Sequence, residues 1–154
     1  MELSQLKELI YNFSESKLKY LEIIGLDINL WNIYRDTLAS IESLGSGNYE
    51  ALGGYQNNYD GRYQLGALAK KDAARILEID YLGDDEIARY QFRNNPQLQE
   101  DYLIGYTYAN HSYLFSANNK YQDLSLNKKL EVLIYAHNQG WRAALDWLTK
   151  GSLH

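Results

Sequence analysis

Residues 41–66 read IESLGSGNYEALGGYQNNYDGRYQLG, and the fold prediction depends on this stretch. A helical pattern ends at its first residues, which include the carboxylate Glu42. About 20 residues rich in Gly, Asn and Tyr follow before helical periodicity returns near residue 66. So long a polar, aromatic segment directly after one carboxylate is more typical of a functional loop than of a simple connection. We therefore expect this segment to shape a groove with Glu42 at its edge.

The composition indicates one globular domain. The chain has 154 residues, of which 45% are hydrophobic and 23% are charged, which is enough for one domain with a substantial core. There is no cysteine, which excludes disulfides and thiolate chemistry. A formal net charge of −5 argues against nucleic acid as the main partner. The chain has 15 tyrosines against 3 phenylalanines, which favours partly solvent-exposed ligand-binding surfaces, because a tyrosine ring can stack on a ligand while its hydroxyl binds water.

The N-terminal sequence predicts no targeting signal. MELSQLKELIYNF lacks the basic and then apolar pattern of a signal peptide, and the chain has no apolar run long enough to span a membrane. We therefore expect a cytoplasmic protein, unless a partner machinery, a holin or a virus particle delivers it elsewhere.

Apolar spacing predicts a mainly α-helical chain. Pro96 is placed to open one helix, and Asp123 or Ser125 to cap another. Residues 1–25 are expected to form a helical extension and residues 26–151 the main unit of one compact domain. Residues 44–64 are expected to be loop with a short irregular hairpin. The predicted helices cover residues 3–24 with a break near Ser14, 28–43, 66–79, 84–93, 97–116, 126–138 and 141–150.

Glu42 is the first candidate for chemistry. The helix before it carries an apolar stripe in steps of three and four, made of Trp31, Tyr34, Leu38 and Ile41. Glu42 comes four residues after Leu38, so we expect it on or beside the buried face. Apolar neighbours disfavour the charged form of a carboxyl and raise its pKa, as a general acid needs. The alternative is an ordinary solvated glutamate near a helix end.

Three short segments in sequence order together resemble one family. They are Glu42-Ser43 at a helix end, the run GRYQL at 61–65, and the run AHNQG at 136–140 followed by Trp147-Leu148. They are similar to the motifs of the lysozyme-like lytic transglycosylases, the soluble and goose-type group that cleaves peptidoglycan. The likeness covers roughly residues 30–150, and YDGRYQLG and YAHNQG look like forms found in phage-encoded domains.

The chain departs from the family pattern in two places. His137 stands where a tyrosine is usual, which changes the expected sugar contacts. Arg62-Tyr63 stands where a small apolar pair is common, which affects the floor of the groove.

The resemblance implies a fold and an activity. The fold would be lysozyme-like, mainly α with a small β-hairpin: a helical bundle around a central helix, with the hairpin and loops lining a glycan groove. The enzyme would cleave the MurNAc–GlcNAc β-1,4 bond of peptidoglycan, with Glu42 as the single general acid and base and the substrate's own group attacking to give an anhydro-sugar. The implied substrate-binding residues are Ser43, Tyr49, Tyr59, Tyr63, Gln64, His137 and Asn138, with Tyr55 a further aromatic candidate.

Other functions stay open at this stage. Asp60 could act as a second carboxylate beside Glu42 in a lysozyme-type hydrolase, although Asp60-Gly61 is also a common turn pair. Glu50 is a weaker candidate for that position. A non-catalytic glycan-binding or virion structural module, and a helical protein-interaction module, are the remaining alternatives. We expect no cofactor, and no metal because the histidines lack ligand spacing. Because the net charge gives no attraction to an anionic cell wall, tethering to a virion or larger assembly is expected to bring the protein to its substrate.

Overall fold

The structure is a computed structural model that describes residues 15–43 and 48–150. It is mainly helical with one two-stranded antiparallel sheet, which confirms the predicted mainly-α class and the short hairpin. The helices are α2 (Glu15–Ile24), α3 (Ile28–Glu42), α4 (Ala67–Leu77), α5 (Glu86–Arg93), α6 (Pro96–Ala117), α7 (Asn119–Asp123), α8 (Leu126–Gln139) and α9 (Trp141–Thr149). The strands are β1 (Leu52–Gly53) and β2 (Tyr59–Asp60), and the 3-10 turns are η1 (Asn48–Glu50) and η2 (Tyr55–Asn57).

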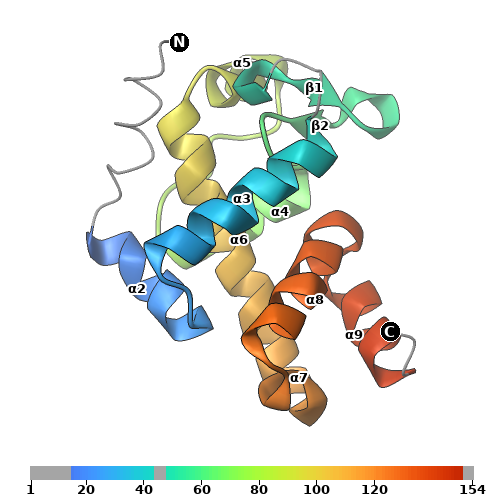
Figure 1. Cartoon of the computed structure of the whole chain (residues 1–154). Helices are drawn as coiled ribbons and strands as arrows, with labels where there is room; N and C mark the ends of the chain where they lie inside the picture. Colours follow the sequence, from blue (N-terminus) through green and yellow to red (C-terminus); the bar gives the residue numbers. More distant parts are fainter. Residues whose placement is uncertain (1–14, 44–47, 151–154) are drawn as a thin grey trace.

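Helix α6 runs through the middle of the molecule (Figure 1). It packs against α2, α4, α5, α7, α8 and α9. Pro96 is its first residue, as predicted, and the Asn95 side chain accepts a hydrogen bond from the Leu98 amide. Buried residues lie on every side of α6, polar ones included. A helix covered all round needs no single apolar stripe.

Helices α2 and α3 share this core. Leu21 and Ile24 from α2 and Trp31 and Leu38 from α3 belong to one buried cluster with residues of α6 and α8. Helix α2 therefore packs as part of the same core in the described chain. The predicted helix break near Ser14 and the glycines at 45 and 47 lie outside the described residues.

The inward face of α3 differs from the prediction at its end. Trp31, Tyr34 and Leu38 are buried as expected, but Ile41 is 55% exposed. Arg35 and Ala39 complete the buried face instead. Ser43, two residues after Ile41, is also buried, so Ile41 lies to one side of the buried face rather than beyond its end. Glu42 itself is half-buried.

Side-chain caps fix several helix starts. The carboxylate of Asp27 accepts from the Leu30 amide at the start of α3, and Ser125 rather than Asp123 caps α8. The one-turn helix α7 was not predicted, because five residues give too short a pattern for periodicity to show.

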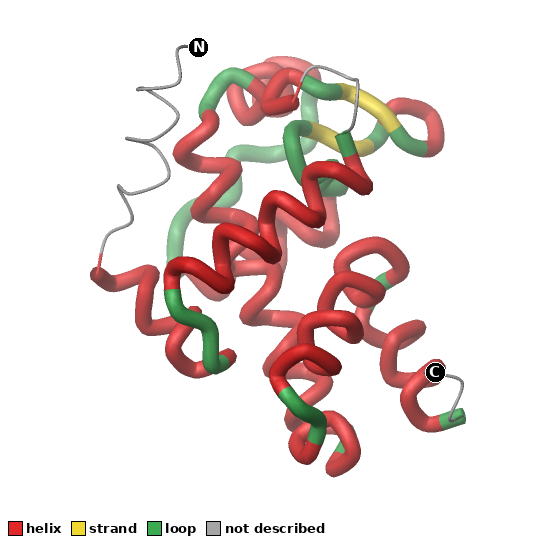
Figure 2. Tube along the Cα trace, viewed as in Figure 1, coloured by secondary structure: helices red, strands yellow, loops and turns green. Residues whose placement is uncertain are grey.

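The hairpin pairs Leu52 with Asp60 and Gly53 with Tyr59 (Figure 2). The Tyr59 ring lies close against the backbone of two glycines. A Cβ atom at Gly54 would lie 2.2 Å from the ring, and one at Gly66 would lie 3.0 Å from it. The hairpin and its following turn thus need both glycines to seat this ring.

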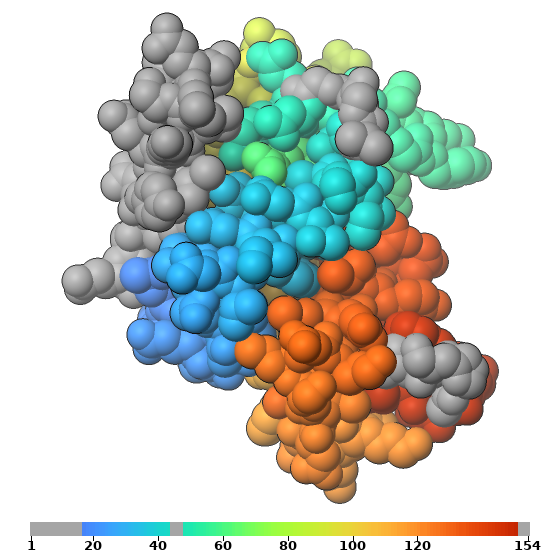
Figure 3. Space-filling model, in the orientation of Figure 1, coloured from blue at the N-terminus to red at the C-terminus, as the bar shows by residue number. Residues whose placement is uncertain are grey.

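The surface seen in Figure 3 brings the three motif-bearing regions together. Helix α3 crosses the front, the hairpin region lies at the upper right, and the C-terminal helices α8 and α9 lie below it. None of the helices in the described ranges combines the length and the apolar character that crossing a bilayer requires.

Candidate functional site

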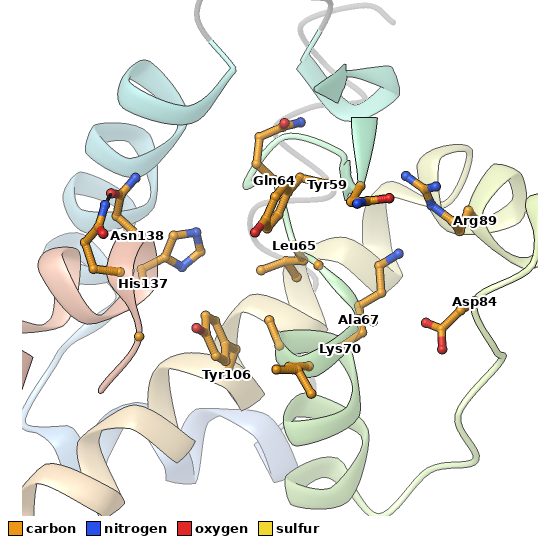
Figure 4. Close-up of a pocket in the computed structure, with 16 residues that line it drawn as sticks. Tyr59, Gln64, Leu65, Ala67, Lys70, Asp84, Arg89, Tyr106, His137 and Asn138 are labelled. Atoms are coloured by element: carbon orange, nitrogen blue, oxygen red, sulfur yellow. Dashed lines mark hydrogen bonds between the residues drawn. The ribbon is translucent and has the colours of Figure 1, made fainter. Parts of the chain in front are cut away.

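A cavity of about 470 Å³ opens between the hairpin, α4 and the junction of α8 with α9. This volume is within the usual range of small-molecule sites. Its lining includes Tyr59 and Gln64 from the hairpin region, Tyr106 from α6, and His137 and Asn138 from α8 (Figure 4). Four of these five residues were predicted as substrate-binding from the sequence, and Tyr106 was not. Residues far apart in the chain therefore meet at one cavity.

Glu42 is joined to this cavity through Asn138. The Asn138 side-chain amide donates a hydrogen bond of 3.0 Å to Glu42 Oε1, across 96 positions of the chain. Glu42 is the last residue of α3, and Asn138 lies in the last turn of α8. Glu42 lies beside the residues that line the cavity, and Asn138 is one of them. Gln139 in turn donates to the Asn138 Oδ1, which fixes the orientation of the amide.

His137 is buried at the back of the cavity in its neutral form. Its Nε2 lies 2.7 Å from the Tyr63 carbonyl oxygen, which can only accept, so Nε2 carries the hydrogen. Burial lowers the pKa of the imidazole, although the Tyr63 carbonyl and the charge of Glu42 act in the opposite direction. The Tyr106 ring meets the imidazole edge-on at 5.4 Å. His137 therefore ties α8 to the turn after the hairpin.

Gln64 lies on the opposite wall, in the turn that precedes α4. Its backbone has a φ of 51°, in the left-handed region. Its side-chain amide donates a 2.9 Å hydrogen bond to the Gly61 carbonyl, which closes the turn on itself. Leu65 pairs with Asp60 in a bridge beside it. The turn thus presents Gln64 to the cavity from a locally fixed backbone.

Gln99 on α6 links three segments of the chain, namely η1, the end of α5 and the turn after β2. Its amide nitrogen donates to the Tyr49 and Phe92 carbonyls, each at 2.9 Å, and its oxygen accepts from the Arg62 amide at 3.0 Å. The side chain is fully buried. Gly61 lies directly against it, since a Cβ there would be 2.2 Å from the Gln99 oxygen. Gln99 therefore fixes the turn after β2 against α6.

The structure does not bring Tyr49, Tyr63 or Ser43 to the cavity. Both tyrosine hydroxyls donate to the fully buried Glu100, at 2.8 and 2.6 Å, and Arg35 lies 3.4 Å from the same carboxylate. Burial next to this carboxylate raises the pKa of both phenols.

This burial removes these three side chains from the expected sugar contacts. Tyr49 and Tyr63 have no free ring face for a sugar. Ser43 is buried too, with its hydroxyl donating to the Ala39 carbonyl. By contrast, Tyr55 is 77% exposed and lies outside the cavity lining.

Asp60 lies in a buried cluster of cations. Its carboxylate accepts from Lys70 at 2.5 Å, from Arg89 at 2.8 and 3.0 Å, and from Arg93 at 2.7 Å. Burial alone would raise its pKa, but the hydrogen bonds from Arg89, Lys70 and Arg93 outweigh burial and lower the pKa from its ordinary value. Asp60 does not line the cavity. All of its bonding capacity serves the junction of β2, α4 and α5.

Sequence reasoning missed Tyr106, Lys70 and Arg89, which also line the cavity. Tyr106 is one of several tyrosines on a helix without a polar face, so nothing in the pattern singles it out. Lys70 and Arg89 look like ordinary surface cations on α4 and α5, although Lys70 is 4% exposed. In residues 15–43 and 48–150, no three histidine, aspartate or glutamate side chains are grouped so that they could hold a metal ion.

Comparison of the chain with protein-family models, with curated proteins and with solved structures finds no match.

Proposed function

We propose that this protein cleaves the glycan strands of peptidoglycan at the MurNAc–GlcNAc β-1,4 bond, in a lysozyme-like fold and by the lytic transglycosylase route. The observation that carries the proposal is the 3.0 Å hydrogen bond between Glu42 and Asn138 at the edge of the cavity. These residues belong to two of the three motifs that suggested the family. Gln64, from the third motif, lines the same cavity.

Glu42 is the residue that moves the proton in this proposal. Breaking a glycosidic bond needs a proton on the leaving oxygen and stabilisation of an oxocarbenium-like centre. Glu42 gives its proton to the leaving oxygen and then accepts one from the substrate hydroxyl that attacks the anomeric carbon, which forms the anhydro ring. The Asn138 amide holds the carboxyl in one rotamer, so orientation is fixed before substrate arrives. No water and no second carboxylate take part.

The location of Asp60 favours this route over two-carboxylate hydrolysis. A hydrolase needs a second carboxylate about 5–9.5 Å from the first, across the bond. Asp60 is enclosed by Lys70, Arg89 and Arg93 and faces away from the cavity. Asp84 does line the cavity, but Figure 4 places it at the opposite end from Asn138. Neither carboxylate is positioned to activate a water against Glu42.

The cavity suits a sugar bearing acetamido groups. Tyr59 is 40% exposed and offers ring surface for stacking. Gln64 and Asn138 offer amide groups, which pair well with hydroxyl and acetamido groups. Tyr106 and His137 form the floor between them (Figure 4). Ring faces and amide groups of this kind are suited to binding the faces, hydroxyls and acetamido groups of sugars.

Mass spectrometry of digested peptidoglycan tests the proposal. We expect fragments with anhydro-muramyl ends from the natural chain and none from Glu42→Gln. Glu131→Gln, an exposed glutamate of α8 paired with Lys128, is the matched control and should cleave normally. Fragments with reducing ends would support the muramidase alternative. If the natural chain releases no fragments but binds glycan, and Glu42→Gln binds equally well, the protein is a glycan-binding module. How the protein reaches the cell wall, for example on a virion, is a separate part of the proposal.

A further inference from the structure

A stacked aromatic pair lies close to the cavity in the chain and in the fold. The rings of Tyr113 and Trp141 lie 4.9 Å apart at an interplanar angle of 26°. Trp141 is the first residue of α9 and directly follows Gly140, which lines the cavity. Tyr113 comes seven residues after Tyr106 on α6. Seven residues are close to two helical turns, so both tyrosines lie on one face of α6, about 10 Å apart.

Helix α4 makes the same connection on its side. Leu68 lines the cavity, and Asp72 follows one turn later on the same face. The Tyr113 hydroxyl donates to the Asp72 carboxylate at 3.2 Å. Each of the three elements α4, α6 and α9 thus leads from a cavity-lining residue to the Tyr113–Trp141 pair. The pair therefore lies near the cavity.

Each ring of the pair has one guanidinium group near it. Arg75 lies 5.9 Å from the centre of the Tyr113 ring, and Arg142 lies 5.5 Å from that of Trp141. Both arginine side chains are exposed. Arg75 also donates to the Tyr113 hydroxyl at 2.7 Å and lies 3.4 Å from Asp72. We call this group of Arg75, Tyr113, Trp141 and Arg142 the arginine–aromatic platform.

The platform carries net positive charge in an acidic protein. It has two guanidinium groups, and one of them, that of Arg75, lies beside the carboxylate of Asp72 in an exposed pair that contributes little to stability. The whole chain has a formal net charge of −5. The hydrogen bond from Arg75 to the Tyr113 hydroxyl and the contact of Arg142 with the Trp141 ring restrain the two guanidinium groups, so less side-chain freedom is lost when they bind an anion. A planar guanidinium fork matches a carboxylate in two parallel hydrogen bonds.

We propose that the arginine–aromatic platform is a subsite for a carboxylate borne by the muramyl residues of the glycan. This inference rests on the proposed function and adds to it the side chains that bind the acid of the glycan and so distinguish it from a neutral chito-oligosaccharide. The rings support the sugar or peptide carbon skeleton, and Arg75 and Arg142 bind the acid. The carboxylate can be the lactyl group itself or an acid of the stem peptide.

Binding measurements by calorimetry test this subsite. The protein carries Glu42→Gln so that no probe is cleaved. The probes are neutral chitotetraose, a GlcNAc–MurNAc tetrasaccharide with free lactyl groups, and the same tetrasaccharide with tripeptide stems. We expect the double variant Arg75→Gln with Arg142→Gln to bind an acidic probe about tenfold more weakly than the parent does. Added salt should narrow this difference, because it screens the arginine charges in the parent. Chitotetraose binding should stay unchanged. Lys128→Gln, which removes an exposed charge elsewhere on α8, is the control.

Each outcome decides the matter. A selective loss on the lactyl probe assigns the lactyl carboxylate, and a loss only on the tripeptide probe assigns the stem. If the double variant binds every probe as the parent does, or loses chitotetraose equally, the subsite is refuted while the cleavage proposal stands. If the parent binds none of the probes, the proposed function fails and the subsite fails with it. Both arginines are exposed, so the variants are expected to fold, which circular dichroism checks.

Discussion

Replacing Asp60 by Asn separates a structural from a catalytic role for this residue. Asn keeps the shape of the side chain but removes the charge that Lys70, Arg89 and Arg93 share. If Asp60 holds the fold, the variant loses stability and still cleaves glycan at temperatures where it is folded. If Asp60 is a second catalytic carboxylate, the variant loses cleavage with little change in stability.

The size of the stability loss follows from burial. The Asp60 side chain is 0% exposed and that of Lys70 is 5% exposed, so the ammonium is left without a counter-charge away from water. Breaking a buried ion pair by removing one partner costs about 3–5 kcal/mol. Arg89 and Arg93 are 21% and 18% exposed, so both can turn toward solvent. We therefore expect the low end of that range, about 3 kcal/mol, and a fall in Tm of roughly 6–12 °C.

Urea unfolding at neutral pH measures this loss. Asp36→Asn is the control, because Asp36 is 60% exposed and pairs with Arg62 at the surface, so its loss should cost about 0.5 kcal/mol. The pKa of Asp60 is lowered in the folded state from 3.8, so its contribution is present above pH 3.8 and is lost as pH falls further. The difference between parent and variant should shrink in that acidic range. A variant that stays within 1 kcal/mol of the parent but no longer cleaves would refute the structural role.

Three further predictions concern other parts of the chain. Gly61→Ala should lower the free energy of unfolding in urea by about 2–4 kcal/mol, because Gly61 has a φ of 85° and a Cβ would meet the Gln99 oxygen. Gly83→Ala, at a φ of 102° but with its nearest atom 4.0 Å away, should lower it by only about 1–2 kcal/mol. Equal losses in the two variants would show that the Gln99 contact is unimportant. Burial lowers the pKa of His111 from 6.5 to about 4, so the unfolded chain gains a proton first and the free energy of unfolding falls as pH drops from 6.5 to 4. In His111→Phe the free energy of unfolding should fall less steeply across this range. The same pH dependence in variant and parent would contradict the assignment. Asn138→Ala should slow glycan cleavage by roughly tenfold or more, because the contact that orients Glu42 is lost. Gln139→Ala should slow it less. Cleavage at the parent's rate in Asn138→Ala would show that Asn138 has no part in the mechanism.

The local pattern of the sequence was sufficient for most of the helices. Asp27, Pro96 and Ser125 act within one turn of their own position, so their caps could be predicted from neighbouring residues. The hairpin was also predictable, because glycine and asparagine at turn positions favour the backbone angles that a tight turn requires. The hydrogen bond between Asn138 and Glu42 was not predicted from the sequence.

The direction in which a side chain faces needed the tertiary structure. Tyr59 and Tyr63 are four residues apart in one tyrosine-rich segment, yet Tyr59 lines the cavity and Tyr63 is buried against Glu100. Ile41 continues the apolar stripe of α3 but is exposed, while Ala39 and Ser43 on either side of it in the sequence are buried. Nothing within a window of a few residues differs enough to predict either outcome.

The sequence by itself determined the helices, their caps, the glycine-dependent turns and the presence of one acidic residue at the end of α3, since each depends on interactions between near neighbours in the chain. Only the tertiary structure decided which polar groups meet. Asp60 meets Lys70, Arg89 and Arg93, and Asn138 meets Glu42 from 96 residues away. The reason is that α6 serves as a common floor for α4, α8 and the hairpin, and the packing of these elements on it fixes where their side chains converge.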